Sequence, residues 1–213
     1  MRILANDAAW GGWGWALVDE AGPIACGHLR LSTRTWRWSA LARVLSGAEP
    51  VHADGGLWSL SGRTISTTSS DFTWPELLRA ADRVVVEQAP AVYSGRGRGR
   101  TGNQAVIGYG LGSLAGPLLT SATQCAGYPW EVDTRTWRSW WGGSSGGGRA
   151  EIKARAVGLV RSLGWHRCLE PFAGGEDEGA RGDVAEAILM GVGATRHLEL
   201  APRGPRRGPD VAP

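Results

Sequence analysis

Arg2-Ile3-Leu4-Ala5-Asn6-Asp7, near the start of the chain, reads as a buried β-strand that ends on a carboxylate. The strand is predicted over residues 2–8, and the Gly11-Gly12 pair that follows predicts a tight turn. A second strand is predicted at Gly14-Trp15-Ala16-Leu17-Val18-Asp19 and a third at residues 24–31. These three strands form an antiparallel meander, which is the frame of the predicted fold.

Helices and strands alternate after the meander. The run Val84-Val85-Val86-Glu87 predicts a fourth strand over residues 83–88, and a fifth is expected near residues 129–133. This order predicts an α/β fold in which a mixed five-stranded sheet, antiparallel in the meander and parallel elsewhere, is flanked by helices. Apolar periodicity and start signals place the helices at 38–46, from Trp74 onward, and at 103–124, 150–163 and 182–197.

Length and composition fit one domain. The chain has 213 residues, of which 42% are hydrophobic, so a single domain over residues 1–200 is expected, followed by a disordered tail over residues 201–213. No apolar run is long enough to span a bilayer and no signal-peptide pattern is present, so a cytoplasmic protein without membrane contact is expected. The cysteines show no paired spacing and are expected to be buried free thiols: Cys26, Cys125 and Cys168.

Four carboxylates lie where they can share a cation. Asp7 and Glu87 each end an apolar strand, where a charge is unfavourable unless it is paired or binds an ion. Asp183 and Glu186 are three residues apart in the last predicted helix and therefore lie on one face. Convergence of the four predicts a site for Mg²⁺ or Mn²⁺, which prefer carboxylate oxygens. The histidines show no metal-ligand spacing and are expected to be structural: His28, His52, His166 and His197.

The order of these features resembles the RuvC-type Holliday junction resolvases of the ribonuclease H-like superfamily. The shared pattern is a strand ending in Asp, a turn followed by Gly-Trp-Ala-Leu-Val, a strand ending in Glu, and a final helix with two acids. The likeness covers most of residues 1–195 but omits 36–73. It includes three further segments: Gly102-Asn103-Gln104, Thr136-Trp137-Arg138 and Arg149-Ala150-Glu151-Ile152-Lys153.

The resemblance implies a metal-dependent, structure-selective endonuclease that nicks four-way (Holliday) junctions in DNA recombination and repair. Lys153 falls on the family's active-site lysine, and Arg138 on a second basic position that is expected to contact DNA with it. Two ions per active site are implied, which together bind the attacking and leaving oxygens. Symmetric nicking implies a homodimer. The catalytic, metal-binding acids of the family fall on Asp7, Glu87, Asp183 and Glu186.

Arginine carries most of the positive charge. Lys153 is the single lysine among 23 basic residues, and the formal net charge is +3. Arg96, Arg98 and Arg100 alternate with glycine, a composition suited to binding DNA phosphates. Tyr93 lies beside them and is in place to stack on an unpaired base at the centre of a junction. The same composition also fits a solvated linker.

The sequence departs from the family pattern at two points. The last acid is Glu186, where aspartate is commoner, and Ala8-Ala9-Trp10 replaces the usual Pro-Gly after the first acid. A longer carboxylate still reaches a cation, so the first departure changes geometry more than chemistry. The Ala-Ala-Trp turn and the content of 12 tryptophans resemble phage-encoded members of the family.

Three other functions fit parts of the sequence. A flap or branched-DNA nuclease of looser specificity would use the same acids. A nucleotide-binding protein of the actin-like or sugar-kinase type also begins with a strand ending in Asp and a glycine-bearing hairpin, but it needs a second phosphate-binding hairpin and a longer chain. A catalytically inactive DNA-binding or scaffolding protein is disfavoured because all four acids are present.

Overall fold

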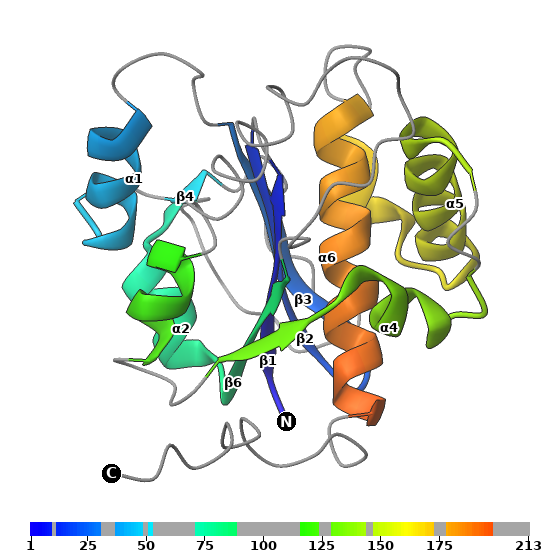
Figure 1. Cartoon of the computed structure of the whole chain (residues 1–213), viewed down its shortest axis with the longest axis horizontal. Coiled ribbons are helices and arrows are strands. Elements are labelled where there is room, and N and C mark those ends of the chain that lie inside the picture. The colour runs from blue at the N-terminus through cyan, green and yellow to red at the C-terminus, as the bar shows by residue number, and fades with distance from the viewer. Residues whose placement is uncertain are drawn as a thin grey trace, which may run out of the picture.

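A mixed sheet forms the centre of the structure, which is a computed structural model. Figure 1 shows the sheet between two groups of helices. The structure describes residues 1–9, 12–30, 37–48, 51–52, 71–88, 116–123, 129–143, 147–172 and 178–197.

The sheet has five strands in the order β3-β2-β1-β6-β7. β1 pairs with β2, and β2 with β3, in the antiparallel sense, whereas β1 pairs with β6, and β6 with β7, in parallel. The predicted mixed sheet is therefore confirmed, and the structure pairs its first and fourth predicted strands in parallel. Its strands are β1 (Ile3–Ala9), β2 (Gly12–Asp19), β3 (Gly22–Arg30), β6 (Arg83–Glu87) and β7 (Trp130–Val132).

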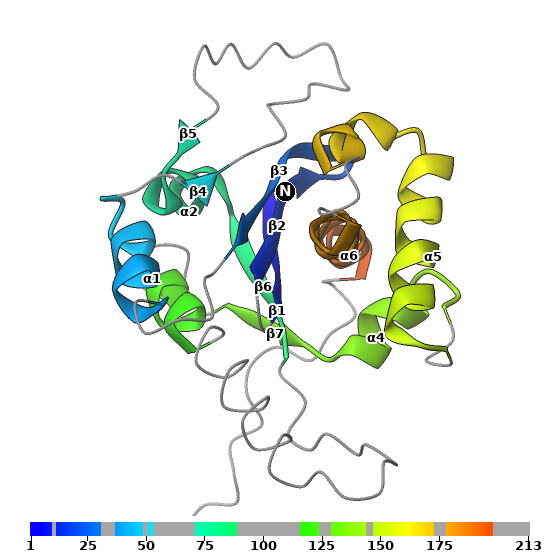
Figure 2. The ribbon, with the colours of Figure 1, turned by 90° about the horizontal axis from the view of Figure 1, so that it is seen from above.

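Helices cover both faces of the sheet. Figure 2 shows α1 and α2 on one side and α4, α5 and α6 on the other. A separate two-stranded pair joins β4 (Val51–His52) to β5 (Asp71–Phe72), and residues 116–123 are also helical. The helices are α1 (Arg37–Leu45), α2 (Trp74–Ala80), α4 (Thr134–Ser139), α5 (Arg149–Ser162), the 3₁₀ helix η1 (His166–Phe172) and α6 (Glu178–His197).

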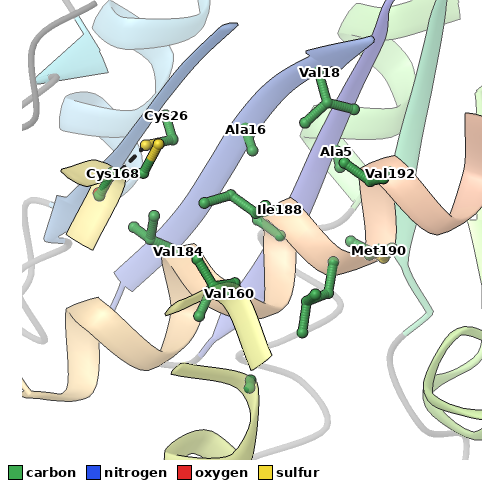
Figure 3. Packing of buried hydrophobic residues seen from close by; sticks show 14 of the residues in the cluster. Ala5, Ala16, Val18, Cys26, Val160, Cys168, Val184, Ile188, Met190 and Val192 are labelled. Atoms are coloured by element: carbon green, nitrogen blue, oxygen red, sulfur yellow. Dashed lines mark hydrogen bonds between the residues drawn. The ribbon is translucent and has the colours of Figure 1, made fainter. Parts of the chain in front are cut away.

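Each face of the sheet has its own hydrophobic core. On one face, side chains from β1 and β2 pack against α6, with Ala5, Val18 and Ile188 among them (Figure 3). On the other face, side chains of the sheet pack against α1 and α2, and the rings of Trp13 on β2 and Trp74 on α2 lie 4.8 Å apart in an edge-to-face arrangement. Because α6 lies between the sheet and α5, all of its residues from 182 to 194 are buried.

A buried asparagine joins the two central strands. Asn6 Nδ2 donates to the carbonyl oxygens of Leu4 and Val85 at 3.3 and 3.2 Å, and Asn6 Oδ1 accepts from Trp13 Nε1 at 2.8 Å. Its polar atoms are therefore satisfied inside the core, as a buried amide requires. The bond to Val85 ties β1 to β6 directly beside Asp7, the next residue along the chain.

Two cysteines are buried next to each other. Cys26 and Cys168 are free thiols, as predicted, and Cys26 Sγ donates to the Cys168 carbonyl oxygen at 3.5 Å (Figure 3). A side-chain hydrogen bond with the Cys168 thiol, together with burial, raises the pKa of Cys26 well above its ordinary value. Cys125 lies outside the described residues.

Several element boundaries differ from their predictions. The last helix begins at Glu178, four residues before the predicted start. The helices α4 and η1 were not predicted. Residues 116–123 confirm the described part of the helix predicted at 103–124. The predicted arginine-glycine loop at 94–100 and the predicted disordered tail at 201–213 lie outside the described residues.

None of the described helices is both long and apolar enough to cross a membrane.

Candidate metal centre

A row of three residues crosses the sheet beneath α6. Asp7 on β1 lies opposite Gly14 on β2, which in turn lies opposite His28 on β3. Gly14 is required here because an added Cβ would lie 2.5 Å from the carbonyl carbon of Asp183 and 2.6 Å from its oxygen. The missing side chain lets the backbone of α6 contact the sheet, which brings Asp183 next to Asp7.

Three carboxylates converge at this contact. Asp183 and Glu186 lie on the same face of α6, as their spacing predicts, and Asp7 faces them from β1. One carboxylate oxygen from each of the three residues lies within 4.8 Å of the others. The exposed fractions of Asp7, Asp183 and Glu186 are only 5%, 6% and 4%. Three buried acids in such proximity repel one another unless protons or cations compensate their charge.

The electrostatic strain is concentrated on Asp7. Burial raises the pKa of its carboxyl group well above the ordinary value of 3.8, and the charges of Glu87, Glu186 and Asp183 raise the pKa further. Its Oδ2 atom is buried and has no hydrogen-bond partner among the described residues. A buried acceptor without a donor is rare in a folded protein. Asp7 Oδ2 therefore lacks the counter-charge that its position calls for.

Asp183 is stabilised from two sides. His28 Nε2 lies 3.2 Å from Asp183 Oδ2, and Lys153 Nζ donates to Asp183 Oδ1. Burial acts to raise the pKa of Asp183, but the His28 hydrogen bond and the Lys153 charge bring it below the ordinary value. Gly182 makes room for the lysine, because a Cβ there would lie 2.6 Å from Lys153 Cδ. This carboxylate is therefore kept ionised inside the protein.

Glu186 has an arginine as its partner. Arg138 Nη2, from α4, lies 2.7 Å from Glu186 Oε1, and its guanidinium lies over the ring of Trp137 with 5.1 Å to the centroid. Burial and the charge of Glu87 nevertheless raise the pKa of Glu186, although Arg138 acts in the opposite direction. One arginine is thus too little to compensate the acids around it.

Glu87 lies at the edge of the cluster. It ends β6 directly after Val86, which pairs with Asn6 of β1, so it is adjacent to Asp7. Its Oε1 accepts a hydrogen bond from the Thr134 hydroxyl and one of 3.5 Å from Trp137 Nε1. Glu87 does not belong to the closest group of three acids, but its charge raises the pKa of both Asp7 and Glu186.

Most of the sequence-predicted site residues meet here. The structure brings together Asp7, Asp183, Glu186, Lys153 and Arg138, with Glu87 beside them. The predicted DNA-binding residues Tyr93, Arg96, Arg98 and Arg100 lie outside the described residues.

Two residues that contact the acids were not predicted from the sequence as part of the site. His28 was expected to be structural, but its ring contacts Asp183. Thr134 carried no prediction, yet it donates to Glu87. The signal for His28 lies in strand periodicity, because positions 26 and 28 of β3 lie on one face and Cys26 belongs to the core beneath α6. This periodicity predicts the position of His28 only once it is known which face of β3 packs against α6.

The donor set fits a divalent cation of the Mg²⁺ or Mn²⁺ class. All the closest donors are carboxylate oxygens, which these hard cations prefer over nitrogen and sulfur. The unpartnered Asp7 Oδ2 and the raised pKa of Asp7 both indicate a missing positive charge at this position. Asp7, Asp183 and Glu186 are the residues that would hold the ion, with Glu87 adjacent.

Comparisons with known proteins identify the fold. The sequence matches no protein-family model, and no curated protein matches it. Solved structures of RuvC from Thermus thermophilus are similar to it. The structure of that RuvC in complex with Holliday junction substrate has a TM-score of 0.54 and 13% sequence identity, over 94% of this chain and 96% of that one.

A second Thermus thermophilus RuvC structure has a TM-score of 0.55 and 12% identity, over the same shares of the two chains. The five-stranded mixed sheet flanked by helices is therefore the ribonuclease H-like fold of these RuvC structures. A sequence identity of 12–13% shows a shared fold. A shared fold does not by itself define the chemistry, which depends on the residues of the site.

Proposed function

We propose that this protein is a metal-dependent, structure-selective DNA endonuclease that nicks four-way (Holliday) junctions. The observation that carries the proposal is the buried group Asp7, Asp183 and Glu186, in which Asp7 Oδ2 has no partner among the described residues. Lys153 and Arg138 compensate the negative charge of the cluster only in part, which is unfavourable in a core, and a divalent cation removes that penalty. The ribonuclease H-like fold, shared with a RuvC whose structure contains junction DNA, supports the choice of substrate.

The residues have distinct roles in the proposed reaction. Asp7, Asp183 and Glu186 hold Mg²⁺ or Mn²⁺, and Glu87 joins them so that two ions are bound per site. When bound, two such ions supply a water-derived nucleophile and stabilise the leaving oxygen of the phosphodiester. Lys153 Nζ lies at the same site as a compact cation suited to the charge that develops on the phosphate.

The proposed substrate surface extends beyond the acids. Arg138, which binds Glu186, and Lys153 are proposed to contact the DNA backbone. Arg96, Arg98 and Arg100 are proposed to bind phosphates, and Tyr93 to stack on an unpaired base, in line with their composition. Two nicks at symmetric positions of a junction require two active sites related by a two-fold axis, so we propose a homodimer.

Cleavage of defined DNA structures tests the function. Labelled four-way junctions, flaps and linear duplexes of the same sequences are incubated with the protein in EDTA, in Mg²⁺ and in Mn²⁺. We expect paired nicks in the junction with either metal, little cleavage of the duplex and none in EDTA. Equal cleavage of flaps and junctions would instead support a branched-DNA nuclease of looser specificity. Cleavage in EDTA would contradict the metal-dependent mechanism.

The Asp7→Asn variant tests the site directly. The amide has the shape of the carboxylate but lacks its charge, so we expect a loss of cleavage of at least about 100-fold, within the range for removal of a group that stabilises a transition state. Junction binding in gel-shift assays is expected to remain, because it depends on phosphate contacts. Asp19→Asn is the matched control. Asp19 is the last residue of β2 and accepts a hydrogen bond from Ala21 N, whereas Asp7 pairs with Gly14 near the other end of β2. Cleavage by Asp7→Asn at the wild-type rate would place the active site elsewhere.

A further inference from the structure

His28 occupies an unusual place for a histidine. It is 8% exposed, on β3, and it stands in the row with Gly14 and Asp7 that crosses the sheet beneath α6. Its Nε2 atom lies 3.2 Å from Asp183 Oδ2. A buried imidazole that contacts a buried carboxylate of the metal group has a more specific role than filling the core.

The two oxygens of Asp183 are held from opposite sides. Oδ2 contacts His28 on β3, whereas Oδ1 accepts from Lys153 on α5. The backbone of Asp183 is itself pressed against the sheet at Gly14. Rotation of the carboxylate therefore breaks at least one of its two contacts. Because Asp183 is ionised and can only accept, Nε2 is the donor in the contact with His28.

His28 acts through Asp183 and not as a ligand itself. Among the described residues, the group of side chains whose ligand atoms lie close enough to share an ion contains Asp7, Asp183 and Glu186, but not His28. A neighbour that donates to a metal-binding carboxylate fixes its orientation and tunes its affinity for the ion.

We propose that His28 is a positioning residue, which holds the Asp183 carboxylate toward Asp7 and Glu186 and thereby raises the affinity of the site for a divalent cation. This inference rests on the proposed metal site. It assigns to β3, a strand that contributes none of the acids, a direct part in forming that site.

Calorimetric titration with Mn²⁺, without DNA, tests the proposal. Wild-type protein is compared with His28→Phe, which keeps a buried ring but removes the donor, and with Asp7→Asn. We expect His28→Phe to bind Mn²⁺ about 10- to 100-fold more weakly than wild type, the usual effect of removing such a neighbour. The melting temperature of each metal-free variant is measured in EDTA, so that a loss of folding is recognised.

A second pair of variants separates hydrogen bonding from packing. The side-chain amide of His28→Gln reaches as far as Nε2, whereas that of His28→Asn is too short. We expect Gln to restore Mn²⁺ affinity to near the wild-type value and Asn to leave it as weak as Phe. This comparison also decides the matter if His28→Phe does not fold, because both amides are polar and smaller than the imidazole.

Each outcome has a defined meaning. Equal Mn²⁺ affinity of wild type, Phe and Asn variants, with binding lost only in Asp7→Asn, overturns the role of His28 and leaves the metal site intact. Equal affinities of the Gln and Asn variants also overturn it. Saturable Mn²⁺ binding that is absent in wild type, or unchanged in Asp7→Asn, overturns the metal site and the inference that rests on it.

Discussion

Asp7 is unfavourable for the stability of the metal-free protein. Its carboxyl group is buried next to Glu87, Glu186 and Asp183, so its pKa is raised by burial first and then by their charges. Natural proteins accept such local destabilisation at functional sites. The acid is thus poorly explained by folding and well explained by a cation that binds it.

We therefore expect Asp7→Asn to stabilise the metal-free protein at neutral pH. A raised native pKa means that the native state holds the proton more tightly than the unfolded state, so stability falls as pH rises from about 3.8 through the native pKa. The amide does not ionise and escapes this loss. In urea unfolding in EDTA, we expect the variant to have the larger free energy of unfolding at pH 7.5. The difference in free energy from wild type should become smaller toward pH 4. Saturating Mn²⁺ should reverse the order, because only wild type binds it. A variant that is less stable than wild type at every pH would contradict this account.

Gly14 lies in close contact with the backbone of Asp183 on α6. We expect Gly14→Ala to reduce stability by about 1–3 kcal/mol, the usual effect of overpacking, because its Cβ would lie within 2.6 Å of the Asp183 backbone. Moving α6 away also separates Asp183 from Asp7, so Mn²⁺ affinity should fall as well. The control is Gly158→Ala on α5, where a Cβ meets nothing within 4 Å and helix propensity predicts a gain of up to about 1 kcal/mol. Urea unfolding and Mn²⁺ titration of both variants measure the effects; equal behaviour of the two would show that the contact at Gly14 is not tight.

At the scale of elements, the short helix α4 supplies more to the site than its length suggests. Its six residues include Thr134 and Trp137, which donate to Glu87, and Arg138, which binds Glu186. The N-cap residue of the helix is Asp133, whose Oδ1 accepts from the backbone nitrogens of Arg135 and Thr136 at 2.8 and 3.3 Å. This cap compensates for the few hydrogen bonds within so short a helix.

Removal of the cap should therefore affect both stability and the site. We expect Asp133→Ala to lower the unfolding free energy by about 1 kcal/mol and to weaken cleavage by loosening Arg138. The hydrogen bond from Thr136 lowers the pKa of Asp133, so its contribution is present above pH 3.8 and is lost as pH falls through the native value. The difference between wild type and Asp133→Ala in urea unfolding should shrink accordingly in acid. Asp133→Asn keeps a capping side chain and should stay close to wild type at pH 7; a loss as large as that of alanine would exclude the capping explanation.

Elements with strong periodic patterns could be predicted, and those formed by tertiary packing could not. A charge that interrupts an apolar run is a clear signal in a sequence. It allowed us to predict the strands that end at Asp7 and Glu87 and the acidic pair on α6. The helix α4 has no apolar stripe, and η1 is a 3₁₀ helix with Pro171 inside it. His28 illustrates the limit for single residues: a lone histidine in a strand has no partner in the sequence, and its partner, Asp183, is 155 positions away.

At the scale of the whole molecule, the two faces of the sheet differ in the polar groups that they hold. The face that packs against α1 and α2 is filled with large apolar residues and with Asn6, whose hydrogen bonds are satisfied. The face beneath α6 holds the acids at the ends of β1 and β6, together with the cations from α4 and α5. Both faces contain a hydrophobic core, and the face beneath α6 holds in addition a cluster of charges that is unfavourable without metal.

Binding of DNA by the whole molecule should depend on the arginines of residues 96–100. We expect replacement of Arg96, Arg98 and Arg100 by glutamine to weaken junction binding and to flatten its salt dependence, because each lost phosphate contact removes about 0.9 from the slope of log K against log salt. The matched control replaces three arginines of the tail, Arg203, Arg206 and Arg207, which lowers the net charge from +3 by the same amount. Gel-shift titrations over a range of salt concentrations measure both slopes. A smaller salt slope in the first variant alone assigns the phosphate contacts to residues 96–100. An equal decrease in both variants means that the slope reports total charge. An unchanged slope means that residues 96–100 do not touch the DNA.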